Sequence, residues 1–165
     1  MNNILVTGGN GQLGNELRIL SSKKSGNCSY EFIDIDDLDL TNKDEVIDFF
    51  KHKKYNWIIN CAAYTAVDKA ETEKEIAEKI NCNAIYNIIE AAEFNKSKII
   101  HISTDFVFNG AKSEPYNEED TTEPINYYGI TKLKGEQVLK NNYDKYFIIR
   151  TSWLYSVYGN NFVKT

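Results

Sequence analysis

The sequence has little proline, cysteine or histidine, and it has no long apolar run. Its two prolines, Pro115 and Pro124, lie in one polar stretch, so proline interrupts none of the strand-like segments. No apolar run approaches the roughly 20 residues that span a bilayer. Three widely spaced cysteines and two histidines lack the spacing of a disulfide framework or a zinc site. We therefore expect neither a membrane protein nor a metal site.

Positive charge is also scarce. The 165 residues carry 19 Lys and Arg against 24 Asp and Glu, which gives a net charge of −5. This balance disfavours nucleic acid and acidic membranes as partners. The chain starts without a basic region or an apolar signal core, so we expect a cytoplasmic protein. Its length and its 42% hydrophobic content predict one domain, residues 1–165, with a sizeable core.

Short apolar runs alternate with longer amphipathic segments. The strand-like runs are residues 3–7, 30–34, 57–60, 98–103 and 146–150. The helix-like segments are residues 11–22, 41–53, 72–95 and 126–141. Their expected inward positions are Leu13, Leu17, Leu20, Val46, Phe49, Phe50, Ile76, Ile80, Ile85, Ile88 and Ile89. The alternation predicts an α/β fold, a Rossmann-like doubly wound parallel sheet with helices on both faces.

A glycine-rich turn links the first strand to the first helix. Gly8, Gly11 and Gly14 follow the spacing G-x-x-G-x-x-G. Without side chains, the backbone can approach a pyrophosphate closely, and the helix N-terminus adds free N–H groups and partial positive charge. The strand–turn–helix context favours dinucleotide binding, although a plain tight turn would show the same glycines. The spacing differs from the usual G-x-G-x-x-G and indicates a particular class of reductases.

Acidic residues follow the second strand. Asp34 lies about 20 residues beyond the glycine turn, where an acid can bind ribose hydroxyls. Asp36, Asp37 and Asp39 make the region strongly acidic, so it should repel a 2′-phosphate and favour NADH. A solvated acidic loop is the alternative interpretation, and Arg18 could still reach a phosphate.

Hydroxyl groups follow the fourth strand, at Ser103 and Thr104, with Asp105 beside them. Ligands of doubly wound sheets bind at the carboxyl ends of the strands, so these groups could meet a substrate carbonyl. An ordinary loop or helix cap would use the same residue types.

Tyr128 and Lys132 are four residues apart on the last expected helix, so they project from one face. A free phenol has a pKa near ~10, and a nearby ammonium lowers it, each unit being worth ~1.4 kcal/mol. An exposed helix pair is the alternative interpretation. The glycine turn and the strand-end hydroxyls favour proton transfer to a carbonyl.

Together these motifs resemble the extended short-chain dehydrogenase/reductase family, over essentially the whole chain. Residues 60–71, Asn-Cys-Ala-Ala-Tyr-Thr-Ala-Val-Asp-Lys-Ala-Glu, and residues 150–153, Arg-Thr-Ser-Trp, resemble its dTDP-4-dehydrorhamnose reductase branch more narrowly. The resemblance implies that the C4 ketone of dTDP-4-dehydro-L-rhamnose is reduced to dTDP-L-rhamnose with NADH or NADPH. It also implies a nucleotide-sugar substrate, and it leaves open whether the protein is a homodimer.

The resemblance also implies roles for individual residues. Tyr128 would protonate the keto oxygen, Lys132 would hold the nicotinamide ribose, and Thr104 would complete the catalytic triad. Thr104, Asp105 and Trp153 would contact the sugar substrate. With Tyr128 and Lys132, the expected cofactor-binding residues are Gly8, Gly11, Gln12, Leu13, Gly14, Asp34, Asp39, Leu40, Ala62, Ala63 and Tyr64.

Members of that family are much longer than this chain. We therefore expect a fragment that retains the cofactor half and lacks most of the substrate domain, so its own activity is an open question. Two alternatives are a different nucleotide-sugar reductase or epimerase of the same family, and a non-catalytic NAD(P)-binding regulatory subunit. The presence of both Tyr128 and Lys132 disfavours the regulatory subunit.

Overall fold

The computed structural model describes residues 1–23, 26–159 and 161–164. Five strands form one parallel sheet in the order β2-β1-β3-β4-β5. They are β1 (Asn2–Thr7), β2 (Cys28–Ile33), β3 (Trp57–Asn60), β4 (Lys98–Thr104) and β5 (Tyr146–Thr151). All five strands lie where the sequence predicts them, to within two residues, and the doubly wound parallel fold is confirmed.

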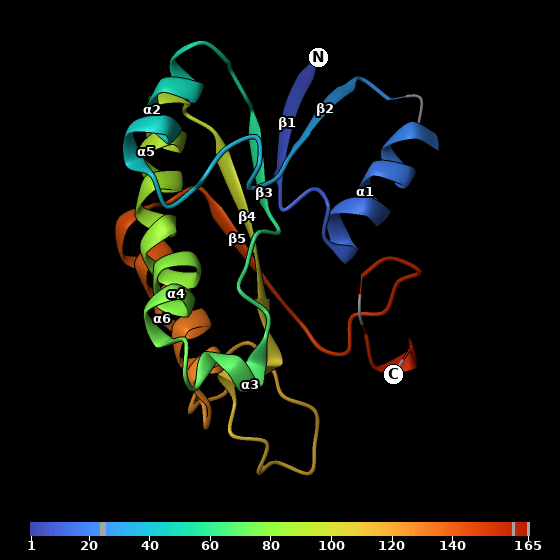
Figure 1. Cartoon of the computed structure of the whole chain (residues 1–165), viewed down its shortest axis with the longest axis vertical. Coiled ribbons are helices and arrows are strands. Elements are labelled where there is room, and N and C mark those ends of the chain that lie inside the picture. The colour runs from blue at the N-terminus through green and yellow to red at the C-terminus, as the bar shows by residue number, and fades with distance from the viewer. Residues whose placement is uncertain (24–25, 160, 165) are drawn as a thin grey trace.

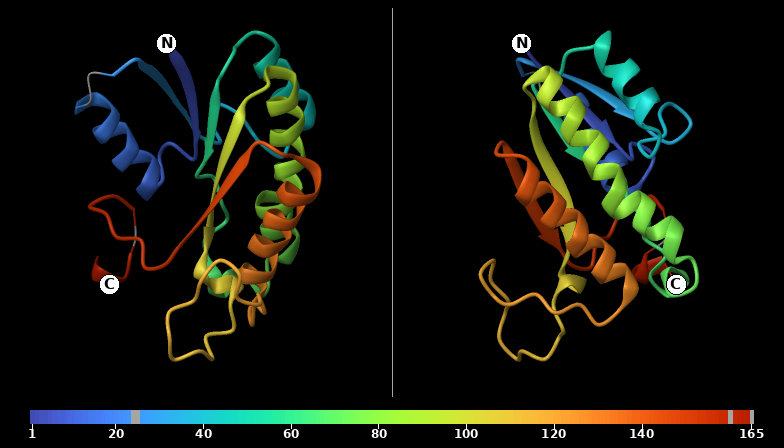
Figure 2. Two further views of the ribbon diagram at one scale, coloured as in Figure 1. Left: turned by 180° about the vertical axis from the view of Figure 1, so that it is seen from behind. Right: turned by 90° about the vertical axis from the view of Figure 1, so that its left-hand side faces the viewer.

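The strand order explains where the helices lie. The chain moves one way from β1 to β2 and the other way from β3 to β5, and right-handed crossovers then place helices on opposite faces. One face carries α1 (Gln12–Lys23). The other carries α2 (Lys43–Lys51), α5 (Ala84–Asn95) and α6 (Tyr127–Asn142), as Figures 1 and 2 show. The direction reverses between β1 and β3, where sheets of this kind bind ligands.

The main core lies between the sheet and α2, α5 and α6. Asn42 caps α2 by accepting a hydrogen bond from the Glu45 backbone, and Val46 and Phe50 are buried as predicted. The other buried members of this core are Leu5, Ile33, Leu38, Tyr55, Ile58, Cys82, Ile85, Ile88, Ile89, Ala91, Ala92, Ile99, Val138 and Leu139. The predicted inward face of α1 is only partly realised, because Leu20 is 52% exposed. Within the described residues α1 has no neighbouring helix on its face of the sheet, so its flank stays open.

The expected single helix over residues 72–95 is interrupted. After the short α3 (Val67–Ala70), the chain forms α4 (Lys74–Glu78), a π-helical segment η1 (Lys79–Asn83) and then α5. The wider π-helical turn rotates the preceding residues relative to α5. Ile76 is therefore 51% exposed rather than buried, and it lines a cleft together with Ile80.

Two glycines let α6 touch other backbones directly. A Cβ at Gly135 would lie 2.2 Å from the Asn81 carbonyl oxygen of η1. A Cβ at Gly129 would lie 2.3 Å from the carbonyl oxygen of Phe106, in the short 3₁₀ helix η2 (Asp105–Val107). These approaches hold α6 directly against η1 and η2.

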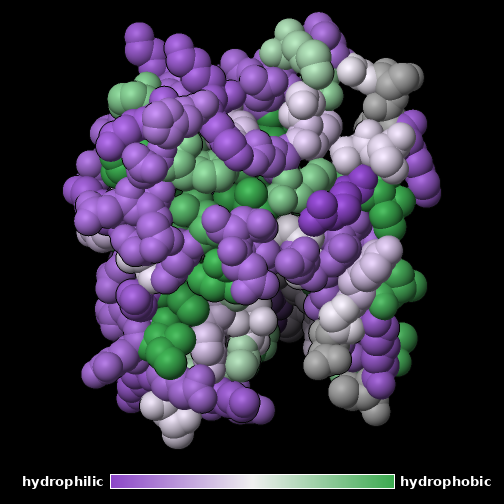
Figure 3. All heavy atoms as spheres, turned by 45° about the horizontal axis from the view of Figure 1, so that its top comes forward, coloured by the Kyte–Doolittle hydropathy of each residue, from purple (hydrophilic) through white to green (hydrophobic). Residues whose placement is uncertain are grey.

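The face of the molecule seen in Figure 3 is mostly polar, and apolar side chains gather in a band across it. On the sheet face that carries α1, Phe147 of β5 is 57% exposed and stacks on Trp57 with ring centroids 6.2 Å apart. No helix in the described part of the chain is long and apolar enough to cross a membrane.

Replacing Gly135 by Ala should destabilise the fold. Alanine gains about 1 kcal/mol in helix propensity, but its Cβ would collide with a backbone oxygen that cannot rotate away. We expect a net loss of about 2 kcal/mol in the free energy of unfolding, measured with urea. Gly26→Ala is the matched control, because a Cβ there meets no atom within 4 Å. Equal stability of the two variants would contradict the close contact.

Candidate active-site cleft

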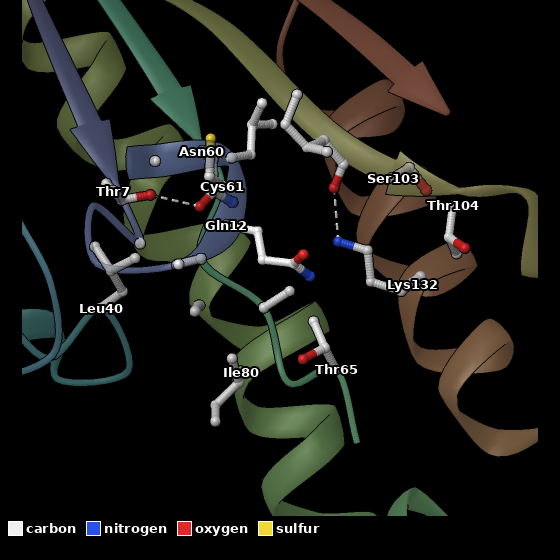
Figure 4. A pocket seen from close by; sticks show the side chains of 18 of the residues that line it. Thr7, Gln12, Leu40, Asn60, Cys61, Thr65, Ile80, Ser103, Thr104 and Lys132 are labelled. Carbon is white, nitrogen blue, oxygen red and sulfur yellow. Dashed lines mark hydrogen bonds between the residues drawn. The ribbon is translucent and has the colours of Figure 1, made fainter. Parts of the chain in front are cut away.

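A cleft of about 1370 Å³ opens at the carboxyl ends of the strands. Its walls come from the glycine turn, from the segments after β2, β3 and β4, from α6 and from the segment after β5. Figure 4 shows Gln12 of α1 and Lys132 of α6 pointing into this space from its two sides. The cleft is large enough for a dinucleotide together with a second ligand.

The glycine turn packs against the segment after β3. Gly8 has φ of +65°, and a Cβ there would lie 2.7 Å from the Ala62 backbone nitrogen. A Cβ at Gly14, in the first turn of α1, would lie 2.4 Å from the Gly8 carbonyl oxygen. The turn is thus closed to side chains at both positions and leaves the N-terminus of α1 facing the cleft.

Asp34 braces this turn from the end of β2. One carboxylate oxygen accepts a hydrogen bond of 2.8 Å from the Asn10 backbone nitrogen, and the other accepts one of 2.8 Å from the Ile35 nitrogen. Arg18 reaches the same turn. It donates to the Gly9 carbonyl oxygen at 3.2 Å and lies over the Phe32 ring.

Three polar side chains form a row across β1, β3 and β4. Thr7 donates to the Asn60 side-chain oxygen at 2.7 Å, and the Asn60 nitrogen lies 3.1 Å from Nδ1 of His101. Because Asn60 uses its oxygen as the acceptor, its nitrogen donates, and the proton of a neutral His101 is on Nε2. Burial lowers the pKa of His101 well below its ordinary value of 6.5, and the nearby Lys132 charge lowers it further. The register pairs of these strands bring the three together, and motif reasoning missed them.

Tyr128 and Lys132 lie on the face of α6 that meets the cleft. Asn126 caps the helix by accepting a hydrogen bond of 2.7 Å from the Gly129 nitrogen. Lys132 is 1% exposed, and its ammonium donates to the Ile102 carbonyl oxygen at 2.8 Å (Figure 4). Burial lowers the pKa of Lys132 to about 8, while the Glu136 carboxylate and the Cys61 thiol act in the opposite direction.

The pKa of Tyr128 differs from our expectation. We expected Lys132 to lower it, but burial raises it above 10, with Asp105 adding to the rise and a hydrogen bond with Thr104 opposing it. The Lys132 ammonium is bound to the Ile102 carbonyl oxygen instead of the phenol. Tyr128 is therefore a protonated phenol at neutral pH, beside the ring of Phe106 at 5.7 Å.

Thr104 caps a helix and also lines the cleft, which are the two roles that the sequence left open. Its hydroxyl caps η2 by accepting a hydrogen bond from the Phe106 nitrogen at 3.2 Å, and it also contacts Asp105 and Tyr128. It is 6% exposed and lines the cleft. The cap holds its hydroxyl at the end of β4, facing α6.

Almost all predicted site residues line this cleft. They are Gly8, Gly11, Gln12, Leu13, Gly14, Asp34, Asp39, Leu40, Ala62, Ala63, Thr104, Asp105, Tyr128, Lys132 and Trp153. Tyr64 is the exception, because its hydroxyl donates to Glu73 at 2.6 Å, outside the cleft. Thr65 lines the cleft in its place.

Asn81 is a residue of the site that motif reasoning missed. It is 1% exposed on η1, and its amide pairs with the backbone nitrogen and oxygen of Tyr64 at 2.9 and 3.1 Å. It also donates to the Thr131 hydroxyl at 3.0 Å. Asn81 thereby joins the cleft wall after β3 to the turn of α6 that carries Lys132. The signal in the sequence is a polar residue inside an isoleucine-rich helix stripe.

The segment after β5 folds back towards α1 (Figure 2). Ser156 donates to Glu16 of α1 at 2.7 Å. Trp153 has φ of +50°, a conformation that costs a non-glycine residue about 1–3 kcal/mol. Its ring is 63% exposed at the cleft and meets Phe162 edge to face at 5.1 Å. The strained backbone presents an indole to the cleft.

The fold and the cleft define a Rossmann-like doubly wound α/β protein with a tyrosine–lysine pair beside its ligand site. Within that class, the family model described as RmlD substrate binding domain matches residues 1–165, and the chain belongs to this family.

Similar proteins share its whole length but extend further. A dTDP-4-dehydrorhamnose reductase from Aggregatibacter actinomycetemcomitans is 45% identical over 100% of this chain and 56% of its own. A solved reductase of that name from Clostridium acetobutylicum is 48% identical with TM-score 0.92, covering 98% of this chain and 57% of its own. One from Bacillus anthracis, in complex with NADP, is 42% identical with TM-score 0.93, covering 99% and 58%. The chain thus spans little more than half the length of these relatives.

Acid should destabilise the protein through His101. Its folded pKa lies below the unfolded value of about 6.5, so the unfolded state binds the proton first and stability falls as the pH drops below 6.5. Between pH 7 and pH 5 we expect a loss of about 2 kcal/mol in the free energy of unfolding that His101→Gln does not show. The variant keeps an acceptor for Asn60. His52→Gln, at an exposed site, is the control and should follow the wild type. Parallel curves for wild type and His101→Gln would contradict this assignment.

Proposed function

We propose that this chain is the cofactor-binding part of an NAD(P)H-dependent reductase that converts dTDP-4-dehydro-L-rhamnose to dTDP-L-rhamnose, for polysaccharide biosynthesis. The observation that carries the proposal is the position of Lys132 across the cleft from Gln12 at the glycine turn, with Tyr128 lining the same cleft. The names of the relatives, and the NADP bound to the one from Bacillus anthracis, support the same activity.

The residues present fit a dinucleotide. The positions of Gly8 and Gly14 have no room for a Cβ, so the turn offers backbone to a pyrophosphate at the start of α1. Asp34 stands at the end of β2, where it would accept hydrogen bonds from ribose hydroxyls. Lys132 would hold the hydroxyls of the other ribose. When bound, the reduced nicotinamide supplies the hydride.

The protein supplies the proton. Because burial keeps the pKa of Tyr128 above its ordinary value, its phenol carries a proton at neutral pH and can donate it to the C4 keto oxygen. The Thr104 hydroxyl orients that phenol, and the Lys132 ammonium would stabilise the phenolate that donation leaves. Asp105 and the exposed indole of Trp153 would contact the sugar.

Two other functions remain alternatives. A different nucleotide-sugar reductase or epimerase would use the same triad and glycine turn, and residues 60–71 and 150–153 are the segments that argue for the rhamnose reductase. A regulatory NAD(P)-binding subunit has no need for a buried Lys132 beside a buried Tyr128. The net charge of −5 supports a small-molecule partner over nucleic acid. A homodimer and a cytoplasmic location stay predictions.

Two variants should distinguish cofactor binding from proton donation, because each removes only one of these functions. We expect NADH fluorescence to saturate with this chain, and Gly14→Ala to weaken binding at least tenfold, because its Cβ would collide with the Gly8 carbonyl oxygen. Tyr128→Phe should bind NADH nearly as the wild type does and lose any reduction of dTDP-4-dehydrorhamnose. Gly26→Ala is the control for the glycine change. No saturable binding, or ketone reduction by Tyr128→Phe, would overturn the proposal.

Asp34 should make the chain prefer NADH to NADPH. Its carboxylate would lie near a 2′-phosphate, and Arg18 is turned towards Gly9 and Phe32. Two charges at short range near a surface interact by roughly 1–4 kcal/mol. Asp34→Asn should therefore improve NADPH binding relative to NADH by about tenfold, or ~1.4 kcal/mol. Asp36→Asn, exposed and outside the cleft, should leave the ratio unchanged. Equal affinities in the wild type would contradict this role of Asp34.

A further inference from the structure

One stripe of α6 meets the end of β4 at three consecutive residues. Tyr128, Lys132 and Glu136 follow each other at intervals of four, so they share one face of the helix. Tyr128 lies beside the side chain of Thr104, and Lys132 donates to the backbone of Ile102. Glu136 accepts a hydrogen bond of 2.6 Å from the hydroxyl of the residue between them, Ser103. The proposed reaction uses the first two members of this stripe and gives no role to the third.

Glu136 is a fully buried carboxylate with strong partners. Arg150 of β5 binds it through two hydrogen bonds, Nε to Oε1 at 2.9 Å and Nη2 to Oε2 at 2.7 Å. Lys140 approaches Oε2 at 3.4 Å. Burial raises the pKa of Glu136, but the hydrogen bonds from Arg150 and Ser103 outweigh it and hold the pKa below its ordinary value. The side chain is therefore charged, and its geometry is fixed by a planar fork.

These bonds connect three elements next to the cleft. Ser103 precedes Thr104 on β4, and Arg150 precedes Thr151, a residue that lines the cleft at the end of β5. The Arg150 guanidinium also lies over the Phe108 ring, 5.0 Å from its centroid, which limits its movement. A slide of α6 along β4 would break the Ser103 and Arg150 bonds together.

Glu136 also acts on the buried ammonium of Lys132. The ionisable groups that act on this ammonium are Glu136 on α6, His101 on β4 and Cys61 after β3. Burial disfavours the charge of Lys132, and Glu136 is the foremost of the groups that oppose this effect. Glu136 thus bears on both the place and the charge of Lys132.

We propose that Glu136 is a positioning residue. By binding Ser103 and Arg150, it fixes where Lys132 and Tyr128 lie along β4 beside the cleft. This inference rests on the proposed function, because the positions of Lys132 and Tyr128 matter only for that reaction. It assigns Glu136 no contact with the cofactor or the sugar.

Glu136→Gln is the principal test, because it keeps the shape of the side chain and removes its charge. Two quantities are measured in this chain: the NADH dissociation constant, and the titration midpoint of Lys132 by NMR of lysine labelled with ¹³C at Cε, assigned with Lys132→Met. We expect the dissociation constant to rise at least threefold and the Lys132 midpoint to fall. Glu78→Gln is the matched control, since it removes another ion pair to α6, Glu78–Lys134 at 2.6 Å, away from the cleft. It should change neither quantity.

The outcomes separate a positioning role from a purely structural one. A folded Glu136→Gln with wild-type NADH affinity and an unchanged Lys132 midpoint overturns the proposal. If Glu136→Gln does not fold, Ser103→Ala decides, because it removes one hydrogen bond and leaves the Arg150 pair: weaker NADH binding supports the proposal and wild-type binding overturns it. If the wild type does not bind NADH, the proposed function fails, and the Lys132 midpoint alone decides on Glu136.

Discussion

The attachment of α6 to the end of β4 is the contact on which the candidate site depends. An ammonium and a carboxylate, one helical turn apart, bind Ile102 and Ser103 of that strand, and a phenol one turn earlier lies beside Thr104. The helix can lie close enough only because Gly129 and Gly135 have no side chains where other backbones touch them. The sheet fixes the end of β4, and the contacts of α6 with that end fix the positions of Tyr128, Lys132 and Glu136.

The close packing of α6 against β4 and η1 requires an unfavourable helix geometry and a buried charge, and other contacts in the chain offset both. The π-helical turn η1 is a rare geometry, and the side chain of Asn81 at its centre makes three hydrogen bonds, two with the Tyr64 backbone and one with Thr131. The buried charge of Glu136 would be unfavourable alone and is balanced by Arg150. The large apolar core between the sheet and α2, α5 and α6 can supply the stability that the polar end of the sheet does not.

Much of this arrangement could be predicted from local sequence signals. Apolar runs located all five strands, and the glycine spacing located the turn that faces the cleft. The predictions failed where tertiary contacts change the local geometry: Ile76 turned towards the cleft because of a π-helical turn, and Tyr64 turned away towards Glu73. Glu136 has the same four-residue spacing as Tyr128 and Lys132, but its partners, Ser103 and Arg150, are distant in sequence and become visible only in the fold.

The position of Lys132 connects its charge with the chemistry proposed for Tyr128. In the structure its ammonium donates one hydrogen bond, to the Ile102 carbonyl oxygen, and the phenol of Tyr128 keeps a raised pKa because burial dominates. An ammonium has three N–H donors, so Lys132 could keep that bond and still offer donors to a ribose. Burial lowers the pKa of Lys132 to about 8, and the Glu136 carboxylate one turn away favours the charged form. In the proposed reaction this charge would stabilise the phenolate that remains after Tyr128 donates its proton.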